Sequence, residues 1–354
     1  MHGDRRRHGG CRPPEQRVMQ MTDFTRKLRI TVLDDYQDVV RTLDCFSKLQ
    51  GHEVTIWNDA MADVDMLAER LATTDVLVLL RERTKVDEAL VSRLPNLKLI
   101  SQNGHVPHID LAACTRHGVL VSSALTSRPS YPTVEFTWGL ILASMRNIPL
   151  ESAALRKGSW QSTVGLGLRG RTLGIYGFGR LGSMVARIGA AFGMELLIWG
   201  RQGSLDRARA EGFPVAESKK ALFEQSDVLS LHLRLNAETT GLIGPKDLAL
   251  MKPTALLVNT SRAELIKPGA LVAALHNGRP GKAAVDVFEK EPLTDPTHPL
   301  LHLPNALCTP HLGYVERDNF EFAYGNAFDQ IVAFANGSAI NIHNPDVLKQ
   351  EHAQ

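Results

Sequence analysis

The sequence has few cysteines and no long apolar run, and these absences exclude several classes of protein. Its four cysteines, Cys11, Cys45, Cys114 and Cys308, are scattered with no CxxC pair, which is typical of free thiols in a reducing compartment. No apolar run approaches the roughly 18 residues that a membrane span needs. The N-terminus also lacks the hydrophobic core of a secretory signal. We therefore expect a cytoplasmic protein with no membrane partner and no bound metal.

Most of the chain also has no excess of positive or negative charge. The formal net charge of the 354 residues is +2, but residues 1–17 alone hold five arginines against Asp4 and Glu15, so the remainder carries −1. This balance argues against a nucleic-acid-binding surface. Residues 1–26 are rich in Arg, Gly and Pro and have no hydrophobic period, so we interpret them as a disordered extension. A start codon assigned upstream of Met19 or Met21 is the alternative.

The chain is organised around residues 172–201. A short apolar run, Thr172–Tyr176, leads directly into the sequence GFGRLG, a helical hydrophobic period follows, and a second apolar run comes after it. This strand–turn–helix–strand context favours a dinucleotide site over a βα turn that merely needs glycine. Gly177 would allow the tight turn, Gly179 would admit the pyrophosphate, and Gly182 would let helix and strand pack closely.

Strands alternate with helices along the whole chain, which predicts an α/β fold of two doubly wound parallel-sheet domains. We predict strands at 29–33, 52–57, 75–80, 97–101 and 119–122, and again at 172–176, 195–199, 228–231, 255–259 and 283–287. Helices are predicted at 39–49, 64–71, 86–94, 109–117, 133–145 and 316–336.

Two of these helices suggest how the domains are joined. Helix 133–145 is apolar over most of its circumference, so we expect it to be buried between domains or subunits and interpret it as a hinge or dimer helix. Helix 316–336 is expected to fold back on the first domain. Both connections would then lie beside a cleft that could enclose a substrate.

Charged or polar residues follow three strands of the second array. Arg262 stands where one strand emerges, Asp286 and Glu291 lie beyond the next, and His311 lies between Pro310 and Gly313. Ligands of open α/β sheets bind outside the carboxyl ends of the strands. These side chains are therefore candidates for the chemistry, although each alone could be an ordinary solvated or structural residue.

The ordered motifs resemble the D-isomer-specific 2-hydroxyacid dehydrogenase family. They are GxGxxG, NTSR at 259–262, DVFEKEP at 286–292 and PHLG at 310–313, with KGSW at 157–160 and the run from Leu168 in addition. The resemblance extends from Leu28 to about residue 340. It implies two Rossmann-like domains with a cleft between them: a flavodoxin-like substrate domain (27–122 and 314–345) and an inserted coenzyme domain (123–313). Helix 133–145 favours a homodimer.

The same resemblance implies roles for individual residues. Arg262 would bind the carboxylate and carbonyl of a 2-oxo acid, for which a planar guanidinium is suited. His311 would be the acid/base and Glu291 the carboxylate that orients it. Asp286 would lie near the nicotinamide carboxamide. Further coenzyme contacts are expected at Arg180, Leu181, His232, Thr260 and Gly313.

Three departures from the family pattern bear on specificity. Coenzyme domains of this type place an acid at the end of the second strand, for the ribose 2′-hydroxyl, but here Gly200 and Arg201 follow it, which favours NADP(H) over NAD(H). Alternatively, Arg201 stacks on the adenine of NAD. Where the family usually has Gly-x-Gly, the predicted substrate loop reads Asn103-Gly104-His105, so only the central residue is a glycine. This difference indicates an unusual substrate or a shifted loop. Arg234 stands where proline is more usual and would add positive charge near the coenzyme or point to solvent.

Three functions follow from these residues. The first is a reductase that moves hydride between NAD(P)H and a 2-oxo acid, yielding a D-2-hydroxy acid. The second is a phosphoglycerate-dehydrogenase-like enzyme without a C-terminal regulatory domain. The third is a nucleotide-sensing corepressor or scaffold, because relatives of that kind can keep the same three residues.

Overall fold

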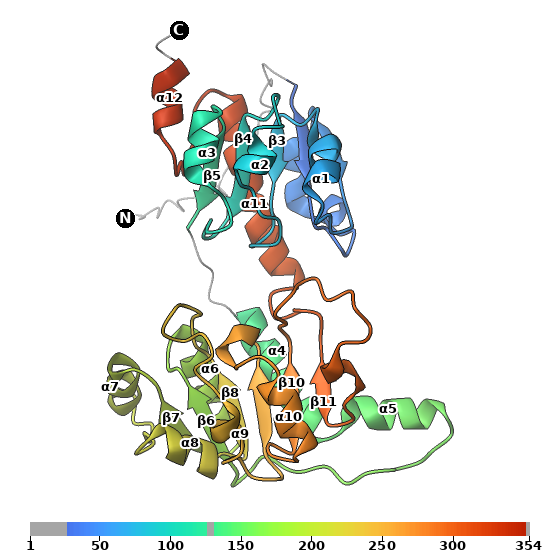
Figure 1. Cartoon of the computed structure of the whole chain (residues 1–354), viewed down its shortest axis with the longest axis vertical. Helices are drawn as coiled ribbons and strands as arrows, with labels where there is room; N and C mark the ends of the chain where they lie inside the picture. The colour runs from blue at the N-terminus through green and yellow to red at the C-terminus, as the bar shows by residue number, and fades with distance from the viewer. Residues whose placement is uncertain (1–26, 126–130, 352–354) are drawn as a thin grey trace, which may run out of the picture.

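The computed structural model describes residues 27–125 and 131–351, so the predicted N-terminal extension and Cys11 lie outside the described residues. Figure 1 shows two α/β domains, one above the other. Each contains one parallel sheet, of five strands in the first domain and of six in the second. The predicted fold class of two doubly wound parallel-sheet domains is confirmed.

The five-stranded domain has the strand order β2-β1-β3-β4-β5. Its strands are β1 (Arg29–Val32), β2 (Glu53–Ile56), β3 (Val76–Val78), β4 (Leu99–Asn103) and β5 (Leu120–Ala124). On one face lie α1 (Val64–Leu71), α2 (Glu88–Val91) and α3 (Leu111–Arg116), and on the other lie η2 (Asp44–Leu49) and α11 (Arg317–Ala335). Because both faces are covered, β3 is buried at all three positions.

The C-terminal part of the chain returns to this first sheet, as predicted. The side chain of Glu316 caps α11 by accepting hydrogen bonds from the backbone N–H groups of Asp318 and Asn319. Phe320, Tyr324 and Phe328 recur every four residues and are buried against β1, β3 and β4. The short helix α12 (Asp346–Glu351) follows.

Two predicted helices of this domain are shorter than expected. The region 39–49 forms two 3₁₀ segments, η1 (Val40–Thr42) and η2, separated by Leu43 in an extended conformation. The side chain of Glu321 accepts hydrogen bonds from the N–H groups of Asp44 and Cys45, which begins a new turn there. In the region 86–94, Val86 forms a parallel bridge with Ile109 instead of a helical turn. Tertiary contacts thus override the helical period in both places.

The six-stranded domain has the strand order β11-β10-β9-β8-β6-β7. Its strands are β6 (Thr172–Tyr176), β7 (Glu195–Trp199), β8 (Val228–Leu231), β9 (Leu256–Asn259), β10 (Lys282–Val285) and β11 (Ala306–Cys308). We did not predict β11, which has three residues and no buried position. The chain reverses direction across the sheet between β6 and β8, and ligands of open α/β sheets bind at such a point.

Helices cover both faces of this second sheet. On one face lie α4 (Tyr131–Met145) and α6 (Arg180–Ala191), and on the other lie α8 (Lys219–Gln225), α9 (Pro245–Leu248) and α10 (Ala270–His276). The helix α7 (Gln202–Ala210) follows β7 at the edge, and the 3₁₀ segments η3 (Ala263–Leu265) and η4 (Pro299–His302) follow β9 and precede β11. None of the described helices could span a membrane.

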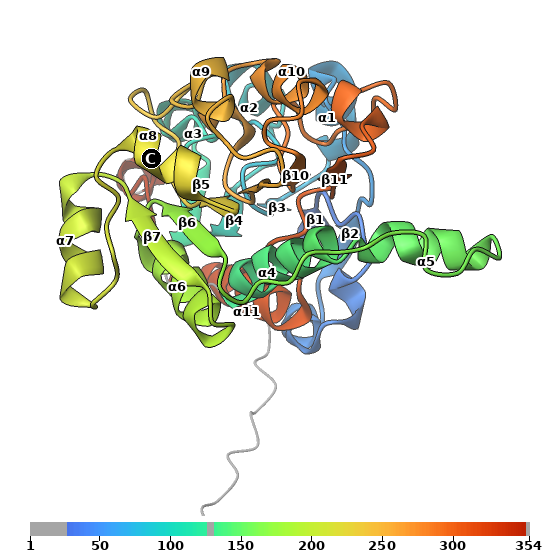
Figure 2. The same cartoon turned by 90° about the horizontal axis from the view of Figure 1, so that it is seen from below.

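The apolar helix α4 is buried within its own domain. Val134, Trp138 and Ile141 pack against β6 and α6, and the Trp138 ring lies 4.9 Å from that of Phe192. This packing accounts for the apolar circumference of the helix, so α4 no longer argues for a dimer. The helix that follows, α5 (Ile148–Arg156), was not predicted and has no buried residue. Figure 2 shows it extending away from the rest of the domain.

Candidate active site

The glycine turn after β6 has the geometry that a dinucleotide needs. Gly177 has φ +101°, and a Cβ there would lie 2.5 Å from the carbonyl oxygen of His232. A Cβ on Gly182 would lie 2.1 Å from the carbonyl oxygen of Gly177, so α6 touches the turn. A Cβ on Gly179 would meet no atom within 4 Å, which leaves open space at the N-terminus of α6. The turn therefore fits a pyrophosphate at Gly179, beside the first N–H groups of α6, which begins at Arg180 and Leu181.

The other predicted coenzyme residues lie along the same edge of the sheet. The N–H of His232 donates to the carbonyl oxygen of Tyr176, and Thr260 shares a 2.9 Å hydrogen bond with Thr137 of α4. Burial lowers the pKa of His232 to about 4, so its ring is neutral. The Nδ1 atom of His232 is buried without a hydrogen-bond partner among the described residues, and a polar group of a ligand could satisfy it.

A cavity of about 230 Å³ contains the three predicted catalytic residues. Its lining comes from both domains and consists of Arg81, Glu82, Arg83, Arg262, Ala263, Glu264, Val287, Phe288, Glu289, Glu291, His311 and Tyr314. A larger, more open hollow of about 770 Å³ lies beside α7, between Trp199 and Glu217, and contains none of the three. We take the smaller cavity as the candidate site because side-chain chemistry converges there.

Arg262 is presented by a rigid turn after β9. The buried side chain of Asn259 donates to the carbonyl oxygen of Arg262 at 2.8 Å and accepts from the N–H of Ser261 at 3.0 Å. The guanidinium of Arg262 donates to the carbonyl oxygen of Ser261. In the described part of the chain no carboxylate lies within ion-pair distance of Arg262, so its charge is available to an anionic ligand.

His311 and Glu291 form a close pair. Nδ1 of His311 lies 2.5 Å from Oε2 of Glu291, and Oε1 of Glu291 accepts a hydrogen bond from the N–H of Phe288 at 3.0 Å. Burial acts to raise the pKa of Glu291, but the hydrogen bond from His311 and the positive charges nearby outweigh it and hold this pKa below its usual range. The carboxylate is therefore ionised and fixes the ring through Nδ1, which leaves Nε2 for a substrate.

Asp286 supports the backbone of His311. His311 has φ +53°, an uncommon conformation for a non-glycine residue. The Asp286 carboxylate accepts hydrogen bonds from the N–H groups of Leu312 and Gly313 at 2.7 and 2.8 Å, and from the Thr309 hydroxyl at 2.6 Å. Burial raises the pKa of Asp286, and these hydrogen bonds oppose the rise. Asp286 thus holds both flanks of His311, a role that we did not predict from the sequence.

The residues of the cavity that were not predicted from the sequence include two arginines and a tyrosine. Arg81 and Arg83 follow β3, and Tyr314 begins the return to the five-stranded domain. Arg83 donates to the Tyr314 hydroxyl at 2.9 Å, and the Arg81 guanidinium lies 5.1 Å from the centre of the Tyr314 ring. The signal was present, since both arginines directly follow a buried strand.

The predicted substrate loop does not line this cavity. Asn103 accepts a hydrogen bond from Asn326 of α11 at 3.1 Å, and the N–H of Gly104 donates to the carbonyl oxygen of Ala124. The carbonyl oxygen of His105 accepts from Gln102. These three residues are engaged with the five-stranded domain, and their proposed contact with substrate stays a prediction.

Comparisons with known proteins find related sequences and structures. Residues 138–313 match the family model described as D-isomer specific 2-hydroxyacid dehydrogenase, NAD binding domain. The chain is 37% identical to a glyoxylate reductase from Aeropyrum pernix over 84% of this chain and 91% of that one.

Two solved structures are also similar along nearly their whole length. A Ralstonia solanacearum protein, provisionally described as a D-3-phosphoglycerate dehydrogenase oxidoreductase, is 51% identical with a TM-score of 0.87, over 91% of this chain and 98% of that one. A phosphoglycerate oxidoreductase from Vibrio cholerae is 47% identical with a TM-score of 0.84, over 88% of this chain and 99% of that one.

Proposed function

The chain belongs to the D-isomer specific 2-hydroxyacid dehydrogenase family, and from that premise we propose that it interconverts a 2-oxo acid and a D-2-hydroxy acid at the 230 Å³ cavity. The observation that carries this proposal is that Arg262 and the Glu291–His311 pair line the same cavity. A bound nicotinamide would supply or accept the hydride.

The side chains of the site have separate roles in the proposed reaction. Arg262 has no competing carboxylate in the described chain, so it binds and orients the substrate carboxylate and carbonyl. Nε2 of His311 gives a proton to the carbonyl oxygen in reduction and takes it from the hydroxyl in oxidation. Glu291 stabilises the protonated ring through Nδ1, while Asp286 holds the His311 backbone.

For the coenzyme, we propose NADP(H) in preference to NAD(H). The support is Arg201, which follows β7 where related sites have an acid. The description of the matched family domain as NAD binding supports NAD(H) as the alternative. The glycine turn itself fits either coenzyme, because the two differ only at the ribose 2′ position.

For the substrate, we propose a 2-oxo acid that carries a second anionic group. Arg81 supports this, because it lines the cavity together with Arg262 and has no carboxylate within ion-pair distance in the part of the chain described. The similar solved structures with phosphoglycerate in their names favour a phosphorylated substrate. The relative named glyoxylate reductase favours a smaller acid.

We propose that the protein is a homodimer and that it works in the cytoplasm. The support for the dimer is the arm formed by α5 and the segment after it, residues 148–164. Leu150, Leu155, Trp160 and Val164 of the arm are between 55% and 94% exposed, an unusual density of apolar side chains for a free surface. The free thiols of Cys45, Cys114 and Cys308 support a reducing compartment.

One set of initial-rate measurements tests the reaction and ranks the substrates. Glyoxylate, hydroxypyruvate, pyruvate, phenylpyruvate and phosphohydroxypyruvate are each tested with NADH and with NADPH, and 3-phosphoglycerate is tested in the oxidative direction. We expect turnover that Arg262→Gln abolishes. Failure of every pair, with nucleotide binding intact, would favour the nucleotide-sensing binding protein over the enzyme.

A further inference from the structure

We propose that Glu238 is a coenzyme-specificity residue, whose carboxylate holds Arg201 and opposes the 2′-phosphate of NADP(H). This inference rests on the proposed function in one respect, which is that a nicotinamide dinucleotide binds at the glycine turn. Glu238 lies in a different loop from the residues that follow β7.

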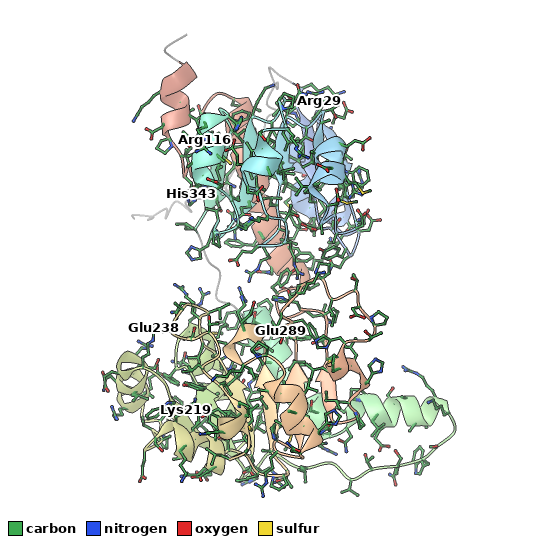
Figure 3. All side chains as sticks on the ribbon, in the orientation of Figure 1. Arg29, Arg116, Lys219, Glu238, Glu289 and His343 are labelled. Carbon is green, nitrogen blue, oxygen red and sulfur yellow. The ribbon has the colours of Figure 1, made fainter. Side chains whose placement is uncertain are left out.

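The position of the pair follows from the order of the strands. Arg201 follows β7, and Glu238 lies in the turn after β8. In the sheet, β6 lies between β8 and β7. The Arg201–Glu238 pair therefore spans the carboxyl end of β6, where the glycine turn begins. Figure 3 labels Glu238 at the end of the six-stranded domain that faces the five-stranded domain, where Glu289 of the cavity also lies.

The ends of β6, β7 and β8 are in direct contact near the Arg201–Glu238 pair. The N–H of Gly177 donates to the carbonyl oxygen of Trp199 at 2.8 Å. A Cβ on Gly200 would lie 3.6 Å from Cα of Gly177, and a Cβ on Gly177 would lie 2.5 Å from the carbonyl oxygen of His232. The adenosine half of a dinucleotide seated on Gly177 and Gly179 would therefore lie beside these strand ends and near both charged side chains.

Arg201 and Glu238 are closely paired but exposed. Nη2 of Arg201 lies 2.5 Å from Oε2 of Glu238, and the two side chains are 63% and 77% exposed. Exposed ion pairs of this kind are weak, so a bound phosphate could compete for the arginine. Gly200 has no side chain to offer the ribose, and Glu238, in the turn after β8, is the carboxylate closest to Arg201.

The turn that carries Glu238 is fixed, so its carboxylate stays near Arg201. The side chain of Asn236 accepts hydrogen bonds from the N–H groups of Glu238 and Thr239 at 2.9 and 3.1 Å. The buried hydroxyl of Thr239 donates to the carbonyl oxygen of Arg234 at 2.7 Å. A fixed turn with one long acidic side chain is suited to presenting a charge to a ligand on the glycine turn.

The two arginines within α7 have other partners. Arg207 donates to the carbonyl oxygen of Phe178 at 2.9 Å, and Arg209 pairs with Asp206 at 3.3 Å. Arg201, directly before α7, is thus the arginine of this segment that pairs with Glu238. A 2′-phosphate bound to Arg201 would also meet the Glu238 carboxylate. This repulsion would reduce the preference for NADP(H) that Arg201 confers, whereas the neutral 2′-hydroxyl of NAD(H) would not be repelled.

The test measures dissociation constants for NADPH and NADH by fluorescence titration of the full chain without substrate. The variants are Glu238→Gln, Arg201→Gln and the double variant, with Glu224→Gln as a matched control that removes an exposed carboxylate from α8, where it pairs with Lys220 at 3.6 Å. We expect Glu238→Gln to tighten NADPH binding about 5-fold and to change NADH less than about 2-fold. In the Arg201→Gln background most of this gain should disappear.

Two results would overturn the inference. One is a Glu238→Gln variant whose ratio of NADPH to NADH affinity stays at the wild-type value. The other is an equal gain for both coenzymes or an equal gain in the Glu224→Gln control, which would indicate only a change in overall charge. If the wild type binds neither coenzyme, the proposed function itself fails, and this inference fails with it.

Discussion

Arg83 of the five-stranded domain lies 3.6 Å, Nη1 to Oε2, from Glu291 of the six-stranded domain. The same carboxylate oxygen contacts Nδ1 of His311 at 2.5 Å. Glu291 is therefore shared between a histidine of its own domain and an arginine of the other. The charge of the proposed acid/base pair thus depends on a contact between the two domains, which no local sequence motif contains.

Glu291→Gln should lower kcat/KM strongly while leaving the protein folded. The amide keeps the shape of the side chain but loses the charge that stabilises protonated His311, so we expect a decrease of about 10²-fold. Initial rates on the best substrate of the panel, with the melting temperature as a check of folding, measure this. An equal loss in Glu224→Gln, which removes a distant exposed carboxylate, would show that the effect is not specific to the pair.

Gly179→Ala and Gly177→Ala should separate coenzyme binding from folding. At Gly179 a methyl group meets no protein atom within 4 Å, so the protein should keep its stability, but the methyl group occupies the space for the pyrophosphate. We expect the dissociation constant for either coenzyme to rise about 10-fold or more. At Gly177 the methyl group would lie 2.5 Å from a carbonyl oxygen at φ +101°, so this variant should also melt at a lower temperature. Unchanged coenzyme binding in Gly179→Ala would argue against the site.

Arg81→Gln should change substrate preference more than overall activity. If Arg81 binds a second anionic group, kcat/KM for phosphohydroxypyruvate should decrease about 10-fold, because one hydrogen bond to a charged group is lost. The value for glyoxylate, which has no second anion, should change less than about 2-fold. A parallel loss on both acids would assign Arg81 to the general shape of the cavity.

Leu155→Glu should convert the proposed dimer to a monomer. Leu155 is 58% exposed on α5, and a charge there would be costly to bury against a second copy of the arm. Sedimentation velocity of the wild type and the variant gives the mass directly. Leu301→Glu is the matched control, because Leu301 is also an exposed leucine, at 43%, but belongs to η4. A wild type that sediments as a monomer would contradict the dimer itself.

The sequence was sufficient for most of the strands and for the glycine turn because these depend on local patterns. Strands β6 and β7 lie at the predicted residues, since a buried parallel strand is a continuous apolar run. The contacts of Arg83 and Glu238 could not be predicted in this way. Each reaches a partner on another strand or domain, and the distance depends on strand order and on how the chain returns through α11. The helix α5 could not be predicted from the sequence, because an exposed helix with no buried residue has no hydrophobic stripe to detect.

Asp75 provides a test of stability that is independent of the proposed reaction. Asp75 is 6% exposed and lies directly before β3. It accepts hydrogen bonds from the side chain and N–H of Arg29 on β1, and from the side chain of Lys98, before β4, at 2.9 Å. Burial acts to raise the pKa of Asp75, but the hydrogen bonds from Arg29 and Lys98 outweigh it and hold the pKa well below the usual range. The ionised carboxylate therefore stabilises the fold above the unfolded-state pKa of about 3.9, and this stabilisation declines as the pH falls below that value.

Asp75→Asn should lower the free energy of unfolding by about 2 kcal/mol at pH 7, because it leaves two cations without their shared partner. At pH 3 the difference between wild type and variant should be smaller by about 1 kcal/mol, since the unfolded wild-type chain then binds a proton that the folded chain does not. Urea unfolding curves at the two pH values measure both differences. A variant that is equally destabilised at pH 7 and pH 3 would mean that the loss comes from packing or geometry and that the charge of Asp75 does not connect β1, β3 and β4.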